Sequence, residues 1–214
     1  VILSLVASDI DDTSTPSWTN SIFPNGDGSP YYSIAMKPSD DAVAYAGNVR
    51  VYKTTDSGTN WSQVFTPESA PFNYPSVGTL MNALTICPFD ENIVFAGVEI
   101  QGTDKGGLFV SEDAGSSWSQ IYLHASSGSN DVDVNDIVFT QESGNIVAYV
   151  GVQYDLSTPT GRSIYKLEQA SSSWTVTQDM NSGTTSTGTT IVVSINDLDY
   201  DATNNTIHAT GTDA

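Results

Sequence analysis

The sequence predicts an all-β fold, a β-propeller built from four-stranded antiparallel blades, with about four blades visible. An eight-residue pattern occurs twice, at residues 54–61 and again 57 residues later at 111–118, and each copy is followed by Ser-Gln and a β-branched residue. Short apolar segments that end in glycine also recur, with the glycines 50, 54 and 60 residues apart. No window has the 3.6-residue apolar period of an amphipathic helix, so we expect almost no helix.

Each repeating unit divides into short strands separated by polar turns. First strands are predicted at 33–36, 83–86, 136–139 and 197–200, and second strands at 43–47, 93–97, 147–151 and 207–211. Third strands follow at 50–53, 107–110 and 163–166, and a fourth strand begins near Trp61, Trp118 and Trp174. The predicted blades therefore span roughly 31–66, 82–123, 135–178 and 195–214 within a single propeller domain or partial propeller at 1–214.

The two ends of the chain are half-units that could complete each other. The fourth unit reaches residue 214 after only two strands, whereas residues 1–22 contain a strand-like segment at 1–7 followed by Trp18. Sharing one blade between the termini would close a ring of four blades, which is the low limit for this architecture. A fragment of a larger ring explains the same pattern, and the abrupt ends favour the fragment.

The charge balance narrows the classes of partner. The chain has 25 acidic and 6 basic residues, for a formal net charge of -19. Binding to nucleic acid or to an anionic membrane surface needs a basic face, so we expect neither. No apolar run approaches the roughly 18 residues that a membrane span needs. Ser, Thr, Asn and Gly replace charged residues, a composition common in exported proteins, so we expect an extracellular or cell-surface location.

The repeated pattern has a fixed set of residue types. Each copy has a hydroxyl residue, an Asp two positions later, a Gly two positions after that and a closing Trp: Thr54, Asp56, Gly58 and Trp61, then Ser111, Asp113, Gly115 and Trp118. Glycine tolerates the positive φ of a tight turn, and an Asp side chain can accept hydrogen bonds from the backbone of that turn. The Trp ring can be buried between blades. These eight residues are therefore predicted to be structural.

These residues resemble the Asp-box, or BNR, repeat. That repeat is shared by sialidases, sortilin-type propellers, xyloglucan-degrading glycoside hydrolases and photosystem II assembly propellers. The chain resembles the sortilin and xyloglucanase groups most, strongly over residues 31–122 and weakly elsewhere. The resemblance implies a propeller whose Asp-box turns lie on the side away from the ligand site. It implies no particular activity.

Two hydrolase activities can be compared with the residues present. A sialidase site resembling the family's needs three arginines to clamp an acidic sugar, and this chain has only Arg50 and Arg162, so we reject that activity for this chain. A hydrolase acting on neutral sugars needs two opposed carboxylates. Asp136 and Asp197 open the first strands of consecutive units and are the most suggestive pair. The alternative is that each Asn-Asp only supplies turn chemistry at the start of a strand.

Alternating acidic residues suggest calcium as the one possible cofactor. Asp131 and Asp133 alternate with Asn135, and Asp197, Asp199 and Asp201 form a second alternating trio. On a strand each trio would point to one face and offer oxygen ligands to Ca²⁺. The trio Asp9, Asp11 and Asp12 is a third possibility. None has the spacing of a known calcium loop, and solvated acidic loops are the simpler interpretation.

Two functional hypotheses follow. The first is a non-catalytic extracellular propeller module that binds a protein or a neutral glycan or builds a surface assembly, with further blades or domains of a longer chain as additional partners. The second is part of a glycoside hydrolase of the xyloglucanase type, with Asp136 and Asp197 as its catalytic candidates. We favour the first, because the sialidase residues are missing and few residues are charged.

Overall fold

The structure is a computed structural model, and it confirms the all-β prediction. It describes residues 2–4, 19–21, 30–74, 78–100, 105–123, 132–153, 163–171, 173–180, 183–184, 190–191 and 193–213. Over these ranges every regular element is a β-strand. The part of the chain that the structure describes therefore has no helix, and none that could span a membrane.

Three four-stranded antiparallel sheets form the body of the molecule, and in each the strands pair in chain order. Blade 1 contains β3 (Ser33–Met36), β4 (Ala44–Gly47), β5 (Val51–Thr54) and β6 (Ser62–Phe65). Blade 2 contains β7 (Thr79–Ile86), β8 (Val94–Ile100), β9 (Lys105–Ser111) and β10 (Ser119–Ile121). Blade 3 contains β11 (Val134–Glu142), β12 (Asn145–Val152), β13 (Ile164–Ala170) and β14 (Ser173–Met180).

A fourth sheet has two strands in the described residues. Blade 4 contains β17 (Val193–Asp201) and β18 (Thr206–Asp213), and β18 pairs there with β17 alone. Two further hairpins form sheets of their own: β1 (Ile2–Ser4) with β2 (Thr19–Ser21), and β15 (Gly183–Thr184) with β16 (Thr190–Ile191). The sequence predicts a strand over residues 1–7 but no strands at 183–191.

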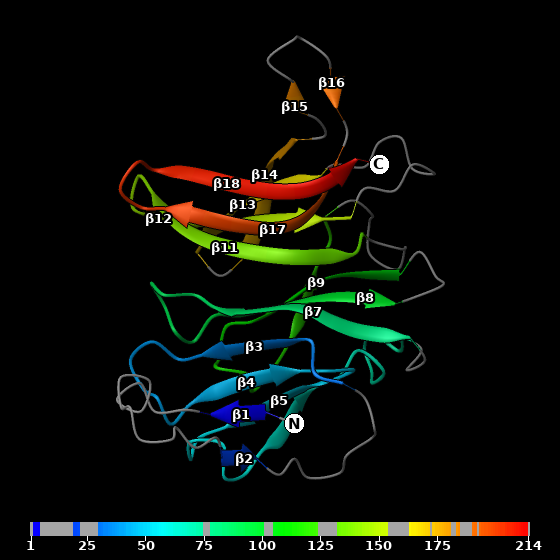
Figure 1. The fold of residues 1–214 in the computed structure, drawn as a ribbon, viewed down its shortest axis with the longest axis vertical. Helices are drawn as coiled ribbons and strands as arrows, with labels where there is room; N and C mark the ends of the chain where they lie inside the picture. Colours follow the sequence, from blue (N-terminus) through cyan, green and yellow to red (C-terminus); the bar gives the residue numbers. More distant parts are fainter. Residues whose placement is uncertain are drawn as a thin grey trace, which may run out of the picture.

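The sheets form an open row rather than a closed ring (Figure 1). The hairpin β1–β2 lies at the end of the row beside blade 1, and β17–β18 lie near the other end. Completion of blade 4 by residues 1–22 therefore stays a prediction.

The innermost strand of each blade packs beside that of the next. β3 contacts β7, β7 contacts β11, and β11 contacts β17. The last three of these strands each carry a bulge at the same point, between Met81 and Ala83, Val134 and Asp136, and Ile195 and Asp197. A bulge inserts one extra residue and re-aims the side chains around it. The residue inserted is Asn82, Asn135 or Asn196, so the three asparagines are structurally equivalent.

Glycines in the second strands let consecutive blades approach closely. A Cβ on Gly47 would lie 2.7 Å from Cβ of Met81 in the next blade, and a Cβ on Gly97 would lie 2.5 Å from Cγ1 of Val134. A Cβ on Gly151 would lie 2.5 Å from Cγ2 of Ile195. The same contact therefore joins blades 1 and 2, 2 and 3, and 3 and 4. Glycine is required here for space rather than for an unusual φ.

The fourth unit departs from this register by one residue. Asp136 pairs with Gly151, whereas its equivalent Asp197 pairs with Thr210. The prediction that Gly211 corresponds to the glycines of the first three units is therefore wrong by one position. Gly211 pairs with Ile195, one step before the bulge.

Large aromatic side chains fill the spaces between the sheets. Phe65 of blade 1 stacks on Trp118 of blade 2, with ring centroids 4.8 Å apart, and also contacts Phe109. Phe95 of blade 2 meets Trp174 of blade 3 at 4.8 Å, edge to face. Such pairs add specific geometry to the apolar area that they bury. The core therefore consists of successive interblade layers.

The two repeated turns, residues 54–61 and 111–118, have the same hydrogen bonds. In the second turn, Oδ1 of Asp113 accepts bonds from the Ser117 N–H and the Ser111 hydroxyl, both at 2.8 Å. The Ser111 hydroxyl oxygen accepts a bond from the Gly115 N–H, and the Trp118 indole donates to the Gly115 carbonyl. Asp56 makes the matching bonds in the first turn. Gly115 has φ +91°, which explains why glycine occurs there.

We expect Gly97→Ala to destabilise the protein by about 1–3 kcal/mol, because the added methyl group overlaps Val134 in the next blade. Urea unfolding measures the free energy. The double variant Gly97→Ala/Val134→Gly tests the cause, since it removes both Val134 atoms that the methyl group would meet, Cγ1 at 2.5 Å and Cβ at 2.8 Å. Additive losses in the double variant would show that the space between the blades is not the reason.

We expect Asp113→Asn to lower the urea midpoint at neutral pH, because asparagine cannot accept all the bonds that the carboxylate receives. Hydrogen bonds from Ser117 hold the pKa of Asp113 below its usual value. The stability it contributes is present above the unfolded pKa of about 3.9 and is lost as the pH falls through the folded pKa. The difference between the two proteins should therefore close below about pH 4. A difference that persists at pH 2 would contradict this.

Candidate functional site at the inner-strand bulges

The bulges gather polar side chains at one end of the blades. The Asn82 amide donates to Oε2 of Glu99 at 2.8 Å, and the Asn135 amide donates to the Ile195 carbonyl at 2.8 Å. Asn196 is exposed. In blade 1 the equivalent residue is Tyr32, whose N–H donates to the Gly47 carbonyl and whose side chain is 44% exposed. We call Tyr32, Asn82, Asn135 and Asn196 the bulge rim.

Asp136 and Asp197 lie directly after two of these bulges and close to each other. Oδ2 of Asp136 accepts a hydrogen bond from the Leu198 N–H of blade 4 at 2.6 Å. Burial is the largest cause of a raised pKa at Asp136, the Leu198 N–H opposes the increase, and the nearby negative charge of Asp197 adds to it. Asp136 is half-buried, while Asp197 is exposed. The structure therefore brings together the two carboxyls that the sequence singled out.

The hydrogen bond of Asp136 differs from what glycoside hydrolysis requires of a catalytic carboxyl. Retaining enzymes hold their two carboxyls about 5 Å apart and inverting enzymes hold them further apart, so that a sugar or a sugar and water fits between them. Asp136 is instead engaged with the backbone of the next blade. The Asp136 carboxyl therefore connects blades 3 and 4 through a hydrogen bond.

The carboxylates of the acidic trios have different hydrogen-bond partners. Asp201 accepts bonds from the Thr203 and Asn204 N–H groups and so holds the turn before β18, while Asp199 accepts from the Tyr200 N–H. Among the described residues no three His, Cys, Asp or Glu side chains lie close enough to hold a metal ion. Asp131 and the trio Asp9, Asp11 and Asp12 lie outside the described residues. Calcium binding in those segments stays a prediction.

The arginines do not form an acid-sugar clamp in the described part of the chain. Arg50 pairs with Glu68, with its guanidinium nitrogen 3.0 Å from the carboxylate. Arg162 lies outside the described residues.

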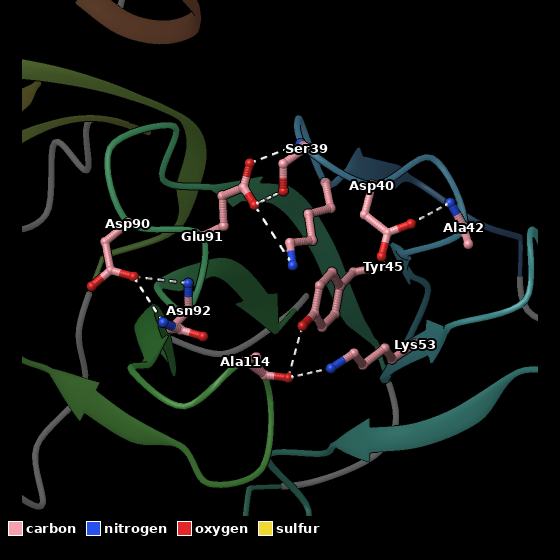
Figure 2. A network of polar contacts seen from close by, with 10 residues as sticks. Ser39, Asp40, Ala42, Tyr45, Lys53, Asp90, Glu91, Asn92 and Ala114 are labelled. Carbon is pink, nitrogen blue, oxygen red and sulfur yellow. Dashed lines mark hydrogen bonds and ion pairs between the residues drawn. The ribbon is translucent and has the colours of Figure 1, made fainter.

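The structure contains a second polar site that the sequence does not predict. At the end of the blades opposite the bulges, the Tyr45 hydroxyl and the Lys53 ammonium of blade 1 both donate to the Ala114 carbonyl, at 2.7 and 2.8 Å (Figure 2). Ala114 belongs to the repeated turn of blade 2 and has φ +54°. In the sequence this site corresponds to a Tyr in the second strand and a Lys in the third. The number of residues between them changes from unit to unit, so no fixed spacing reveals the pair.

The same end of the blades carries an ionic contact. Glu91 in the β7–β8 turn accepts a bond from the Ser39 N–H at 2.8 Å and lies 3.6 Å from the Lys37 ammonium (Figure 2). These partners are partly exposed, so the ion pair itself adds little stability. They nevertheless fix the first-strand turn of blade 1 against that of blade 2.

No family model matches the sequence, and no curated protein matches it. The GH74 enzyme of Niastella koreensis matches with a TM-score of 0.50 and 18% identity, over 84% of this chain and 30% of that one. The GH74 xyloglucanase of Xanthomonas campestris gives 0.47 and 16%, over 84% and 30%. YCF48 bound to a D1 peptide gives 0.44 and 18%, over 78% and 47%.

The chain has a β-propeller fold. Similarity at 18% identity establishes the fold alone, and it agrees with the antiparallel blades described above. This chain spans about 30% of the length of the two GH74 structures.

We expect Asp136→Asn and Asp136→Ala to have different effects on the free energy of unfolding at pH 7. The Ala variant should lose about 1–3 kcal/mol, because the buried Leu198 N–H loses its acceptor. The Asn variant keeps an acceptor and removes a carboxylate whose pKa is raised, so it should equal or exceed the parent in stability. A raised pKa means that the parent gains stability as the pH falls, so the advantage of Asn should shrink toward about pH 4. Urea unfolding from pH 7 to 4 measures it.

Proposed function

We propose that this chain is a propeller segment of the Asp-box type that works as a non-catalytic extracellular binding module for a neutral glycan or a protein. The resemblance of the repeated turns supports the Asp-box assignment, since all the hydrogen bonds of Asp113 stay within one turn. An exported setting agrees with the scarcity of charged residues, which make up 14% of the chain.

One observation carries the non-catalytic proposal: the Asp136 carboxyl, the best catalytic candidate, accepts a hydrogen bond from the Leu198 N–H of the next blade. A general acid or nucleophile must face the scissile bond across a gap. A carboxyl used to join two blades does not meet that requirement.

The bulge rim has the chemistry for a neutral ligand. It combines the exposed Tyr32 ring with amide side chains, one of which, Asn196, is exposed. Aromatic faces contact the apolar faces of sugars, and amides can donate and accept hydrogen bonds with hydroxyl groups. The net charge of -19 disfavours anionic ligands at the same time.

A hydrolase of the xyloglucanase type is the second candidate, favoured by the fold similarity to a GH74 enzyme. It requires catalytic carboxyls other than the Asp136–Asp197 pair, placed across an open groove. Because the chain spans about 30% of that enzyme, such a residue would have to come from a longer protein.

The first proposal predicts binding without turnover. The protein should bind soluble xyloglucan or mixed-linkage β-glucan in affinity electrophoresis, and Tyr32→Ala should weaken binding about tenfold through loss of the ring. Phe89→Ala is the matched control, because Phe89 is equally exposed but lies in the turn that follows β7, away from the bulge. A reducing-end assay on the same samples should detect no hydrolysis.

Release of reducing ends that is abolished by Asp136→Asn would favour the hydrolase instead. Absence of binding to every neutral glycan tested would leave protein ligands as the occupants of the rim and would remove the glycan proposal.

A further inference from the structure

In blade 1, two side chains together bind one backbone carbonyl of blade 2; we call such a pair of donors a receptor. Tyr45 and Lys53 are paired across β4 and β5, and both donate to the Ala114 carbonyl. The Tyr45 ring also lies against Gly115, where a Cβ would meet it at 3.1 Å. Burial and the charge of Asp113 raise the pKa of Tyr45 to about 12, so its hydroxyl stays a donor. The pair therefore holds the repeated turn of blade 2 at a single point.

The equivalent pair in blade 2 is apolar. Register places Phe95 and Val110 at the positions of Tyr45 and Lys53. The hairpin they face in blade 3 has neither the Asp nor the Gly of the repeated pattern between residues 169 and 173, and Phe95 packs on Trp174 instead. The two residues thus match the turn of the following blade: donors where a repeated turn follows, and apolar groups where it does not.

Blade 3 has the donor pair again. Tyr149 and Lys166 are paired across β12 and β13 at the same register. Both now bond to Glu142 of their own blade, with the Tyr149 hydroxyl 2.8 Å from Oε1. In the described residues blade 4 supplies β17 and β18 but no third and fourth strands with a turn between them.

We propose that Tyr149 and Lys166 form a receptor for the turn of a β-hairpin that adds to the edge of β18 and carries the repeated turn pattern. The hairpin would supply the third and fourth strands of blade 4, and the carbonyl at the position of Ala114 would accept both donors. Addition of strands to an open sheet edge is a common mode of polypeptide recognition.

Charge complementarity supports this occupant. Lys53 and Lys166 account for two of the six basic residues in the chain. Burial and the neighbouring Lys37 lower the pKa of Lys53, and the negative charge of Asp113 opposes that shift. The Asp of an arriving turn would take the same place beside Lys166. Glu142 binds both donors and Glu168 pairs with Lys166 as well, so the hairpin competes with two carboxylates of blade 3. The proposed contact between blades 3 and 4 therefore has the same geometry as the observed contact of Tyr45 and Lys53 with the Ala114 carbonyl.

The test uses a synthetic peptide of residues 105–123, which contains the third and fourth strands of blade 2 with their turn, added to the intact protein. Calorimetry or fluorescence anisotropy measures the affinity. A second peptide replaces residues 111–118 with a two-residue Asn-Gly turn and so keeps the strands without the repeated turn. The first peptide should bind and the second should bind at least tenfold more weakly.

Variants distinguish binding through the Tyr149 and Lys166 donors from strand pairing along β18 alone. Tyr149→Phe should weaken the first peptide about fivefold, and Lys166→Met should weaken it tenfold or more, as expected for a neutral and a charged donor. Tyr45→Phe is the matched control and should leave the affinity unchanged, because its own turn is already bound. Circular dichroism checks that each variant is folded. Equal affinity for the two peptides, unchanged affinity in Tyr149→Phe, or no binding at all would overturn the proposal.

Discussion

The close approach of consecutive blades at Gly47, Gly97 and Gly151 is the constraint on which the rest of the structure depends. At each contact a residue just before the bulge of the next innermost strand fills the space that a side chain would need. This brings the two sheets close enough for Phe65 to stack on Trp118, and it fixes where the bulge residues emerge. The repeat of about 50–60 residues is thus the length needed to return the chain to the same contact.

The bulges have the same geometry in blades 2, 3 and 4 but not the same chemistry. After the bulge, blade 2 has Ala83, while blades 3 and 4 have Asp136 and Asp197. The first carboxyl is used between blades, and the second is exposed. Variation among units therefore does not by itself mark a ligand site. One of the varying residues, Asp136, makes a hydrogen bond to the next blade instead of an apolar contact.

Much of the fold could be predicted from the sequence, because turn glycines, closing tryptophans and short alternating segments are local signals. The carboxyl contact at Asp136 could not, since it depends on the Leu198 backbone, which lies 62 residues away. Neither could the shift that replaces Gly211 by Thr210, because a bulge changes register without changing composition. The Tyr45–Lys53 pair was visible in the sequence, but cross-strand neighbours separated by loops of variable length have no fixed spacing.

The Tyr–Lys pair also bears on how such an array can be rearranged. A gene duplication that placed a second copy of the second unit directly after itself would set Phe95 and Val110 against a turn that expects two donors. The turn carbonyl would then be desolvated without a partner, which is unfavourable. Duplication of the first unit meets no such mismatch at this point. Units of one chain are therefore not freely interchangeable, and their linear order is recorded in the residues that face the next unit.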